Sequence, residues 1–145
     1  MLIRSVTDLD WDEWRRMRCG LWPEDSPNGH EQGMRDWVAR PDTVVFVACD
    51  SGGALRGFVE VGSRPYADGC STSPVAFIEG WYVDAGARRQ GVGRALLAAA
   101  EAWARAQDYR EMASDALLDN TVAHRAHEGV GYEEVGRVVQ FRKVL

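Results

Sequence analysis

The feature that most constrains this chain is a strand-like run that leads into a glycine loop and a helix. Residues 75–83 are almost all apolar, as is typical of a buried strand. Residues 88–93 read Arg-Arg-Gln-Gly-Val-Gly, and the alanine- and leucine-rich segment after them favours a helix. Glycines let the backbone approach a ligand closely because they carry no Cβ, and the free N–H groups of a helix N-terminus attract phosphate. The unit therefore predicts a pyrophosphate-binding loop, the alternative being glycines that only permit tight packing.

Other glycine loops fit this segment less well. A dinucleotide-binding Gly-x-Gly-x-x-Gly loop needs a third glycine where Leu96 stands, and a P-loop needs a Gly-Lys-Ser/Thr that the chain lacks. Residues 88–93 do match Arg/Gln-x-x-Gly-x-Gly/Ala. In this they resemble the acyl-CoA pyrophosphate loop of the GCN5-related N-acetyltransferases. The resemblance implies that the chain uses acetyl-CoA as a co-substrate.

Composition narrows the class of protein and its partners. The 145 residues are expected to form one domain, residues 1–145, long enough for a hydrophobic core. The formal net charge of −5 argues against nucleic acid as the main partner. No apolar segment is long enough to cross a membrane, and the N-terminus lacks a signal-peptide core. Cys19, Cys49 and Cys70 have neither disulfide nor zinc spacing, so we expect a cytoplasmic protein without a metal site.

The order of predicted elements indicates an α/β fold. A first strand over residues 2–6 precedes a helix in which Trp11, Trp14, Met17 and Leu21 recur every three or four residues. Further along, we expect helices over 30–39, from the glycine loop to about 107, and over 121–128, and strands over 43–49, 55–61, 75–83, 110–115, 133–138 and 139–145. This is the order of the GCN5-related acetyltransferase fold. The resemblance implies a mixed, mostly antiparallel sheet of about six to seven strands flanked by about four helices.

A narrower resemblance extends over the whole chain. Several segments together are similar to the type I aminoglycoside 6'-N-acetyltransferases; they are 22–23, 64–66, 69–75, 77–80 and 110–115. The resemblance implies transfer of acetyl from acetyl-CoA to the 6'-amine of an aminoglycoside antibiotic, by direct attack in a ternary complex, with antibiotic resistance as the result. It also implies a homodimer in which residues 135–145 pair with a second subunit.

The resemblance places four side chains in the drug site. Glu79 and Asp115 are acids that would bind the cationic drug, and one of them would accept the proton of the amine. A lone carboxylate is costly within an apolar strand, so an ion pair with an arginine is the alternative for Glu79. For Asp115 the alternative is a loop or capping role. Trp22 and Tyr66 would form aromatic walls against sugar rings and ammonium groups, the alternative being core packing.

The expected acetyl-CoA site extends beyond the glycine loop. Backbone N–H groups of the loop would bind the pyrophosphate, and the strand before it would offer main-chain groups to the acetyl and pantetheine parts. Asn120 matches the family's asparagine that contacts the pantetheine arm, and an N-cap role is compatible with that contact. The expected residues are Trp81, Tyr82, Val83, Arg89, Gln90, Gly91, Val92, Gly93, Arg94 and Asn120.

Two positions depart from the family pattern. The last helix lacks the tyrosine that protonates the departing CoA thiolate in many relatives, and His127 is the candidate substitute, unless it only packs. Gly136 stands where related enzymes can carry an acid, so a drug contact from that position is lost. His30 and His124 have no recognisable partners and are expected at the surface, and Cys70 is expected to be structural.

Two rival functions stay open at this point. The glycine loop recognises only the acyl donor, so the acceptor is alternatively the amine of a polyamine, a peptide or a protein. A non-catalytic CoA-binding module is a different class of protein, and the two acids at the expected site argue against it. The residues that distinguish these functions are Trp22, Tyr66, Glu79 and Asp115.

Overall fold

A five-stranded sheet forms the centre of the structure, a computed structural model that describes all 145 residues. The strands lie side by side in chain order: β1 (Leu2–Ser5), β2 (Val44–Cys49), β3 (Leu55–Arg64), β4 (Val75–Val83) and β5 (Met112–Ser114). Neighbours among the first four are antiparallel, and β5 runs parallel to β4. The predicted mixed, mostly antiparallel sheet is confirmed, but it has fewer strands than expected.

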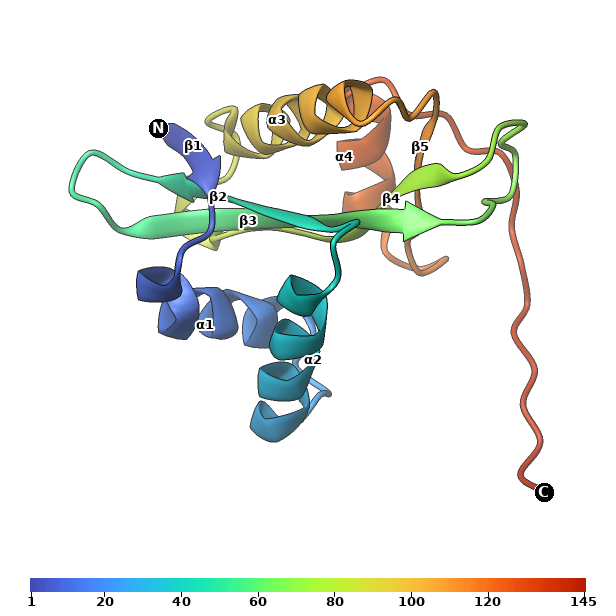
Figure 1. Cartoon of the computed structure of the whole chain (residues 1–145), viewed down its shortest axis with the longest axis horizontal. Coiled ribbons are helices and arrows are strands. Elements are labelled where there is room, and N and C mark those ends of the chain that lie inside the picture. Colours follow the sequence, from blue (N-terminus) through green and yellow to red (C-terminus); the bar gives the residue numbers. More distant parts are fainter.

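Helices cover both faces of the sheet (Figure 1). α1 (Trp11–Leu21) and α2 (Pro27–Ala39) lie on one face, and α3 (Val92–Ala106) and α4 (Thr121–Gly129) lie on the other. Two short 3-10 turns, η1 (Asp8–Asp10) and η2 (Ala85–Ala87), precede α1 and the glycine loop. The number of α-helices agrees with the sequence-based expectation.

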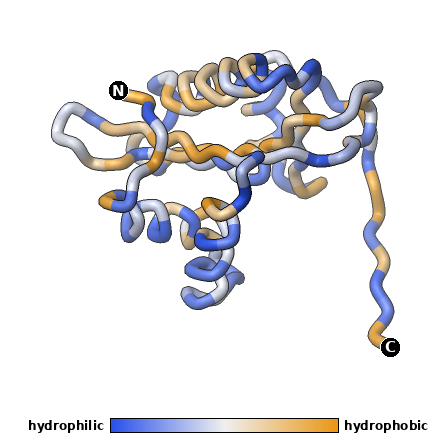
Figure 2. The backbone as a smooth tube through the Cα atoms, in the orientation of Figure 1, coloured by the Kyte–Doolittle hydropathy of each residue, from blue (hydrophilic) through white to orange (hydrophobic).

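The apolar side chains form two cores, one on each side of the sheet. Trp14 and Met17 of α1 belong to the core that includes Phe58 of β3, and Leu96 of α3 belongs to the core that includes Val59. Successive side chains of a strand point to opposite faces, so β3 contributes to both cores. Figure 2 shows the apolar residues concentrated along the central strands and the inner side of α3. The predicted apolar face of the first helix is therefore confirmed.

α2 begins at Pro27, earlier than the predicted residue 30. The Ser26 hydroxyl accepts a hydrogen bond from the Gly29 N–H at 3.0 Å, and proline suits the first turn of a helix. The longer helix packs against α1 and turns His30 inward, where only 1% of the residue is exposed. The prediction that His30 lies at the surface is wrong, because local spacing does not show which side of α2 faces α1.

A β-bulge interrupts the pairing of β3 with β4. Glu60 pairs with Gly80, whereas the next residue, Val61, pairs with Ile78, so Glu79 is an extra residue in β4. A bulge bends its strand and changes the direction of the side chains around it. On the other edge of β4, pairing with β5 ends where Ile78 meets Ser114. The second half of β4, from Glu79 onward, therefore has an unpaired edge.

The two predicted C-terminal strands are absent. After α4 the chain makes no backbone hydrogen bond beyond Tyr132 and extends away from the sheet (Figure 1). The alternation that suggested strands is present, as the alternating colours of Figure 2 show, and Phe141 is 92% exposed. A strand needs a neighbour as well as alternation, and within one chain this segment does not reach the free edge of β5. The sheet therefore ends at β5.

Candidate active site

The glycine loop presents a row of unpaired backbone donors. Gly91 is the N-cap of α3 and has a φ of 81°, and Arg89 has a φ of 62°, so the chain turns sharply into the helix. None of the N–H groups from Arg89 to Arg94 donates a hydrogen bond within the protein. Free N–H groups at the positive end of a helix dipole bind anions. The loop therefore has the donors that a pyrophosphate needs.

The two glycines of the loop serve different purposes. Gly91 supplies a left-handed backbone conformation that L-residues adopt only at a cost. At Gly93 the backbone is helical, and an added Cβ would lie 3.2 Å from the Trp81 indole. Trp81 therefore packs directly on the first turn of α3, so the tight-packing interpretation holds for Gly93 and the turn interpretation for Gly91.

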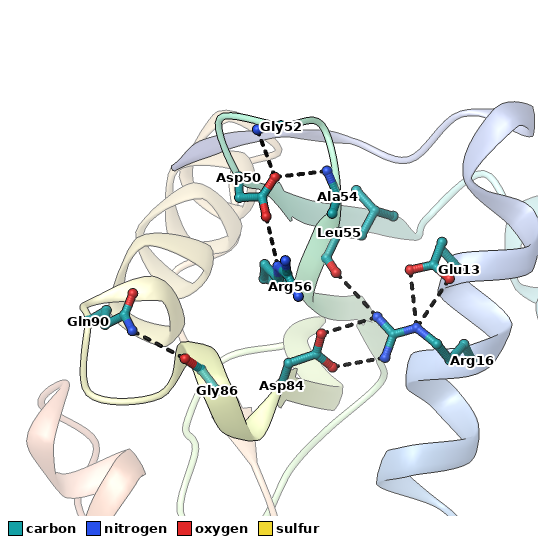
Figure 3. A network of polar contacts seen from close by, with 10 residues as sticks. All are labelled: Glu13, Arg16, Asp50, Gly52, Ala54, Leu55, Arg56, Asp84, Gly86 and Gln90. Carbon is teal, nitrogen blue, oxygen red and sulfur yellow. Dashed lines mark hydrogen bonds and ion pairs between the residues drawn. The ribbon is translucent and has the colours of Figure 1, made fainter.

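Polar contacts made by Arg16 and by Gln90 hold the segment between β4 and the glycine loop in place (Figure 3). Arg16 of α1 donates to both carboxylate oxygens of Asp84, at 3.0 and 3.1 Å, and to the Leu55 carbonyl at 3.2 Å. Asp84 lies between β4 and η2. Within the loop, the Gln90 amide donates to the Gly86 carbonyl at 3.2 Å. No local sequence pattern indicates these contacts, because Arg16 and Asp84 lie far apart in the chain.

The unpaired edge of β4 exposes main-chain groups beside the loop. The Asp84 N–H donates to the Arg56 carbonyl of β3 at 2.8 Å, so strand alternation directs the main-chain groups of Trp81 and Val83 away from β3. The Val83 carbonyl accepts a hydrogen bond from Arg88 at 3.0 Å. By the same alternation, the main chain of Tyr82 faces β3. Three residues of this strand are expected in the acetyl-CoA site. Two of them, Trp81 and Val83, thus present main-chain groups at the open edge.

Glu79 is paired with an arginine, as the alternative interpretation allowed. Arg64 donates to both carboxylate oxygens, at 2.8 and 2.9 Å, and its guanidinium lies 3.5 Å from the centre of the Phe77 ring. The Glu79 side chain is still 30% exposed. A carboxylate accepts more than two hydrogen bonds, so Glu79 retains capacity for an ammonium group of a ligand.

Asp115 is the unpaired acid of the site. It directly follows β5, is exposed, and takes part in no hydrogen bond or ion pair. It lines an open cavity of about 1170 Å³ together with Arg64, Tyr66 and His127. Tyr66 is 74% exposed there, which rules out core packing for its ring. The structure thus places Tyr66, Asp115 and His127 around one cavity.

Trp22 packs on Gly80, the residue after Glu79, and does not line that cavity. It is the C-cap of α1, and its ring packs so closely on β4 that a Cβ at Gly80 would lie 2.7 Å from it. The indole stacks on His30 with ring centres 6.4 Å apart, and Phe58 contacts it edge-on. The residue is half-buried, so core packing accounts for one part of its surface and the rest is exposed.

His127 lies where β4 and β5 separate. Its Nδ1 is 2.6 Å from the Ala123 carbonyl, which only accepts, so Nδ1 carries a proton. Its Nε2 is 2.8 Å from the Ser114 hydroxyl, and its ring meets Trp81 edge-on. Packing and proton exchange through Ser114 are both compatible with this geometry.

The remaining expected donor-site residues take local roles. The Asn120 side chain accepts from the Ala123 N–H at 3.1 Å, so it is the N-cap of α4, and its amide NH₂ stays free. Arg94 donates to the Gly129 carbonyl at 2.7 Å and joins α3 to the end of α4. Gly136 lies in the extended C-terminal segment with open space around it.

His124 and Cys70 lie outside the set of expected site residues. His124 is half-buried and has a partner that the sequence did not indicate, since its Nε2 lies 2.9 Å from the Leu117 carbonyl. Cys70 is free and half-buried, and burial with the nearby Glu111 raises its pKa. A raised pKa disfavours the thiolate, which is the nucleophilic form.

The side chains that commonly bind metal ions do not gather in any group of three or more. Among the helices, none combines the length and the apolar character that a membrane span requires.

One buried polar cluster had no signal in the sequence. Glu60 of β3 is 2% exposed and accepts hydrogen bonds from Trp14 and Arg18 of α1. Burial raises the pKa of Glu60 above its usual range. Arg18 in turn contacts His30 and Trp22. Apart from the Arg18–Trp22 contact, these contacts join residues that are 12 to 46 positions apart, so local patterns do not reveal them.

The fold and the loop define an acetyltransferase. Residues 3–132 match the model of the acetyltransferase (GNAT) family, and this chain belongs to that family. The resemblance inferred from residues 88–93 is confirmed.

Within this family, the chain is similar over its full length to curated aminoglycoside acetyltransferases and to solved structures of such enzymes. Aminoglycoside N(6')-acetyltransferase type 1 of Klebsiella aerogenes is 45% identical over 99% of this chain and 97% of its own length, and that of Stenotrophomonas maltophilia is 44% identical over 99% and 93%. The 6'-N-acetyltransferase AAC(6')-IG from Acinetobacter haemolyticus has a TM-score of 0.94 at 35% identity and covers 100% of this chain and 99% of its own. AAC(6')-Iy, solved in complex with the bisubstrate analog CoA-S-monomethyl-acetylneamine, has a TM-score of 0.93 at 33% identity and covers 99% of this chain and 98% of its own.

Proposed function

We propose that this chain is an acetyl-CoA-dependent aminoglycoside 6'-N-acetyltransferase of type 1 that confers aminoglycoside resistance. The observation that carries the proposal is the arrangement of β4. One strand holds an acid next to Gly80, on which the aromatic Trp22 packs, and continues as an unpaired edge into a loop of free N–H donors. Full-length similarity to named aminoglycoside 6'-acetyltransferases supports the choice of acceptor.

In this proposal the acetyl donor binds along the open edge of β4. The N–H groups from Arg89 to Arg94 would bind the pyrophosphate, and the main chain of Trp81 and Val83 would bind the pantetheine and acetyl parts. The free amide NH₂ of Asn120 would contact the pantetheine arm. Tyr82, whose main chain faces β3, would hold Trp81 and Val83 in place within the strand. A neighbouring solved enzyme, AAC(6')-Iy, was crystallised in complex with CoA.

The aminoglycoside would bind on the acidic side of the strand. Glu79, although paired with Arg64, would accept a further hydrogen bond from an ammonium group, and Trp22 and Tyr66 would contact the sugar rings. We assign the proton transfer to Asp115, since its carboxylate has no internal partner whereas both Glu79 oxygens are occupied. Asp115 would take the proton of the 6'-ammonium directly or through one water.

Direct attack would then follow in the ternary complex. The neutral amine forms the C–N bond to the thioester carbonyl, the C–S bond breaks, and the sulfur leaves as a thiolate. Holding the two reactants in place would supply much of the rate. As the amide forms, the nitrogen would release its second proton, and the thiolate would take up one proton by relay through the Ser114 hydroxyl and His127 Nε2, which lie 2.8 Å apart. No acyl-enzyme on Cys70 is part of this scheme.

We further propose a homodimer, formed by one domain per chain, in the cytoplasm. β5 has a neighbour on only one edge, and the extended C-terminal segment carries exposed apolar side chains: Val135, Val138, Val139, Phe141, Val144 and Leu145. An open sheet edge and an apolar extended segment are complementary between two copies. Light scattering at micromolar concentration should give a dimer mass, and Phe141→Asp should shift it toward the monomer. A monomer mass for the unchanged chain contradicts this part of the proposal.

Thiol release from acetyl-CoA tests the function directly. Two matched aminoglycosides, one with a 6'-amine and one with a 6'-hydroxyl, serve as acceptors. We expect turnover only with the 6'-amine. Turnover of both would reject the regiochemistry, turnover of polyamines or peptides alone would favour another acceptor amine, and no turnover with any amine would favour a non-catalytic CoA-binding module.

A further inference from the structure

A buried polar network lies directly behind the aromatic ring of Trp22. It runs from Glu60 on β3 through Arg18 on α1 to His30 on α2 and ends at the Trp22 main chain. Three of its members are almost fully enclosed, with Glu60 2%, His30 1% and Arg18 9% exposed. None of them reaches the cavity around Asp115. Buried polar groups of this kind cost stability unless they are hydrogen-bonded, and these are.

Glu60 and Arg18 anchor the network to the sheet. Arg18 Nη1 donates to Glu60 Oε1 at 2.5 Å, and the Trp14 indole N–H donates to the same oxygen at 2.9 Å. The Arg18 guanidinium lies 4.9 Å from the centre of the Trp22 ring, within the range of a cation–π contact. Gly33 makes room for it, because a Cβ there would lie 3.0 Å from Arg18 Nη2.

His30 connects this anchor to Trp22 in one protonation state. Arg18 Nε, 3.5 Å from His30 Nδ1, can only donate, so Nδ1 accepts. The neutral ring then carries its proton on Nε2, which donates to the Trp22 carbonyl at 3.1 Å. The same imidazole stacks on the Trp22 indole at an interplanar angle of 21°. His30 therefore holds Trp22 by its main chain and by its ring.

We propose that His30, supported by Arg18 and Glu60, is a positioning residue that fixes Trp22 as a wall of the aminoglycoside site. The inference rests on the proposed function. Trp22 caps the end of α1 and is followed by an exposed turn at residues 23–26, so its own helix does not fix it on the C-terminal side. The turn adds one hydrogen bond, from the Asp25 N–H to the Trp22 carbonyl at 3.2 Å, and the network, the Phe58 ring and the Gly80 backbone also hold the residue.

Steady-state kinetics of three variants tests this role. His30→Leu removes both hydrogen bonds and should raise the KM for a 6'-amine aminoglycoside about five- to tenfold, with the KM for acetyl-CoA unchanged and kcat within about twofold. His30→Gln keeps a donor and should recover part of the drug KM. Met34→Ala, on the same helix and fully buried, controls for lost packing and should lower stability without moving the drug KM.

A double-mutant cycle with Trp22→Ala isolates the path of the effect. If His30 acts through Trp22, His30→Leu should add nothing to the drug KM in the Trp22→Ala background. Unchanged drug KM in His30→Leu, an equal rise in Met34→Ala, or fully additive effects in the double variant would each overturn the inference while leaving the proposed function intact. Absence of aminoglycoside turnover in the unchanged protein would instead reject the proposed function, and this inference with it.

Discussion

Arg64 and Glu79 form a two-bond ion pair across neighbouring strands, with donor–acceptor distances of 2.8 and 2.9 Å. Arg64 is the last residue of β3, and Glu79 is the extra residue of the β4 bulge. The charge of Glu79 is therefore compensated before any drug binds. An ammonium group of the drug would share this carboxylate with the guanidinium, so the two residues would act on the drug as a pair.

Glu79→Gln should raise the aminoglycoside KM by about tenfold or more. The change removes an attractive charge and also leaves the Arg64 cation uncompensated beside a cationic substrate. Arg64→Gln added to Glu79→Gln should therefore recover part of the loss. The measurement is the drug KM at saturating acetyl-CoA, and a double variant with a higher KM than Glu79→Gln alone would contradict the pair model.

Asp115→Asn should lower kcat about 100-fold, the usual effect of losing a positioned proton acceptor. Asn keeps the shape of the side chain and cannot take the proton of the ammonium. Asp119→Asn, an exposed acid on the same loop, is the matched control and should leave kcat unchanged. A kcat for Asp115→Asn within about twofold of the unchanged enzyme would move the proton acceptor elsewhere.

Gly91→Ala should raise the acetyl-CoA KM about tenfold and leave the drug KM within about twofold. At a φ of 81° an alanine is strained by about 1–2 kcal/mol, so the loop would shift and misdirect its N–H groups. Gly86→Ala is the control, since its φ is not positive and a Cβ there meets no atom within 4 Å. Equal acetyl-CoA KM values for the two variants would show that the left-handed turn is not needed for donor binding.

Asp10→Asn should lower the free energy of unfolding by about 2 kcal/mol at pH 7. Hydrogen bonds from Arg4 lower the pKa of the buried Asp10 carboxyl from 3.8 to about 2. The unfolded state then binds the proton more tightly, so this stabilisation is full above pH 4 and is lost as the pH falls toward 2. Urea unfolding of the variant and the unchanged protein should show the difference shrinking over that interval.

Asp12→Asn is the surface comparison for that experiment. Its side chain is 88% exposed and pairs with Arg15 at 3.0 Å, an arrangement that contributes little in water. Its unfolding free energy should match that of the unchanged protein at both ends of the pH range. An equal loss of unfolding free energy in both variants would mean that the Arg4–Asp10 pair stabilises the fold no more than an exposed surface pair.

The elements with strong local signals could be predicted from the sequence. The strand, the glycine loop and α3 follow from apolar runs, two glycines and good helix formers, and all three are present. Gly91 adopts the left-handed conformation that such a loop requires. These features depend on residues within a few positions of one another, which is the range that spacing and propensity report.

The features that depend on distant contacts could not be predicted. His30 is buried because α2 starts early and packs on α1, and the C-terminal residues alternate as strands do but lack a neighbour. From sequence, the Arg64–Glu79 pair is one of two alternatives for Glu79, because only the register of β3 against β4 brings the two residues together. Each of these outcomes is decided by tertiary packing, which overrides local preference.

The bulge at Glu79 divides β4 into two stretches that would contact different substrates. Residues before and at the bulge belong to the acidic side that would meet the antibiotic, and residues after it form the unpaired edge that leads to the glycine loop. Substitutions before Gly80 should therefore change antibiotic binding and leave acetyl-CoA binding intact. Selection for activity on a new antibiotic should act on that part of β4. Substitutions downstream of Gly80 would instead weaken acetylation of every antibiotic at once.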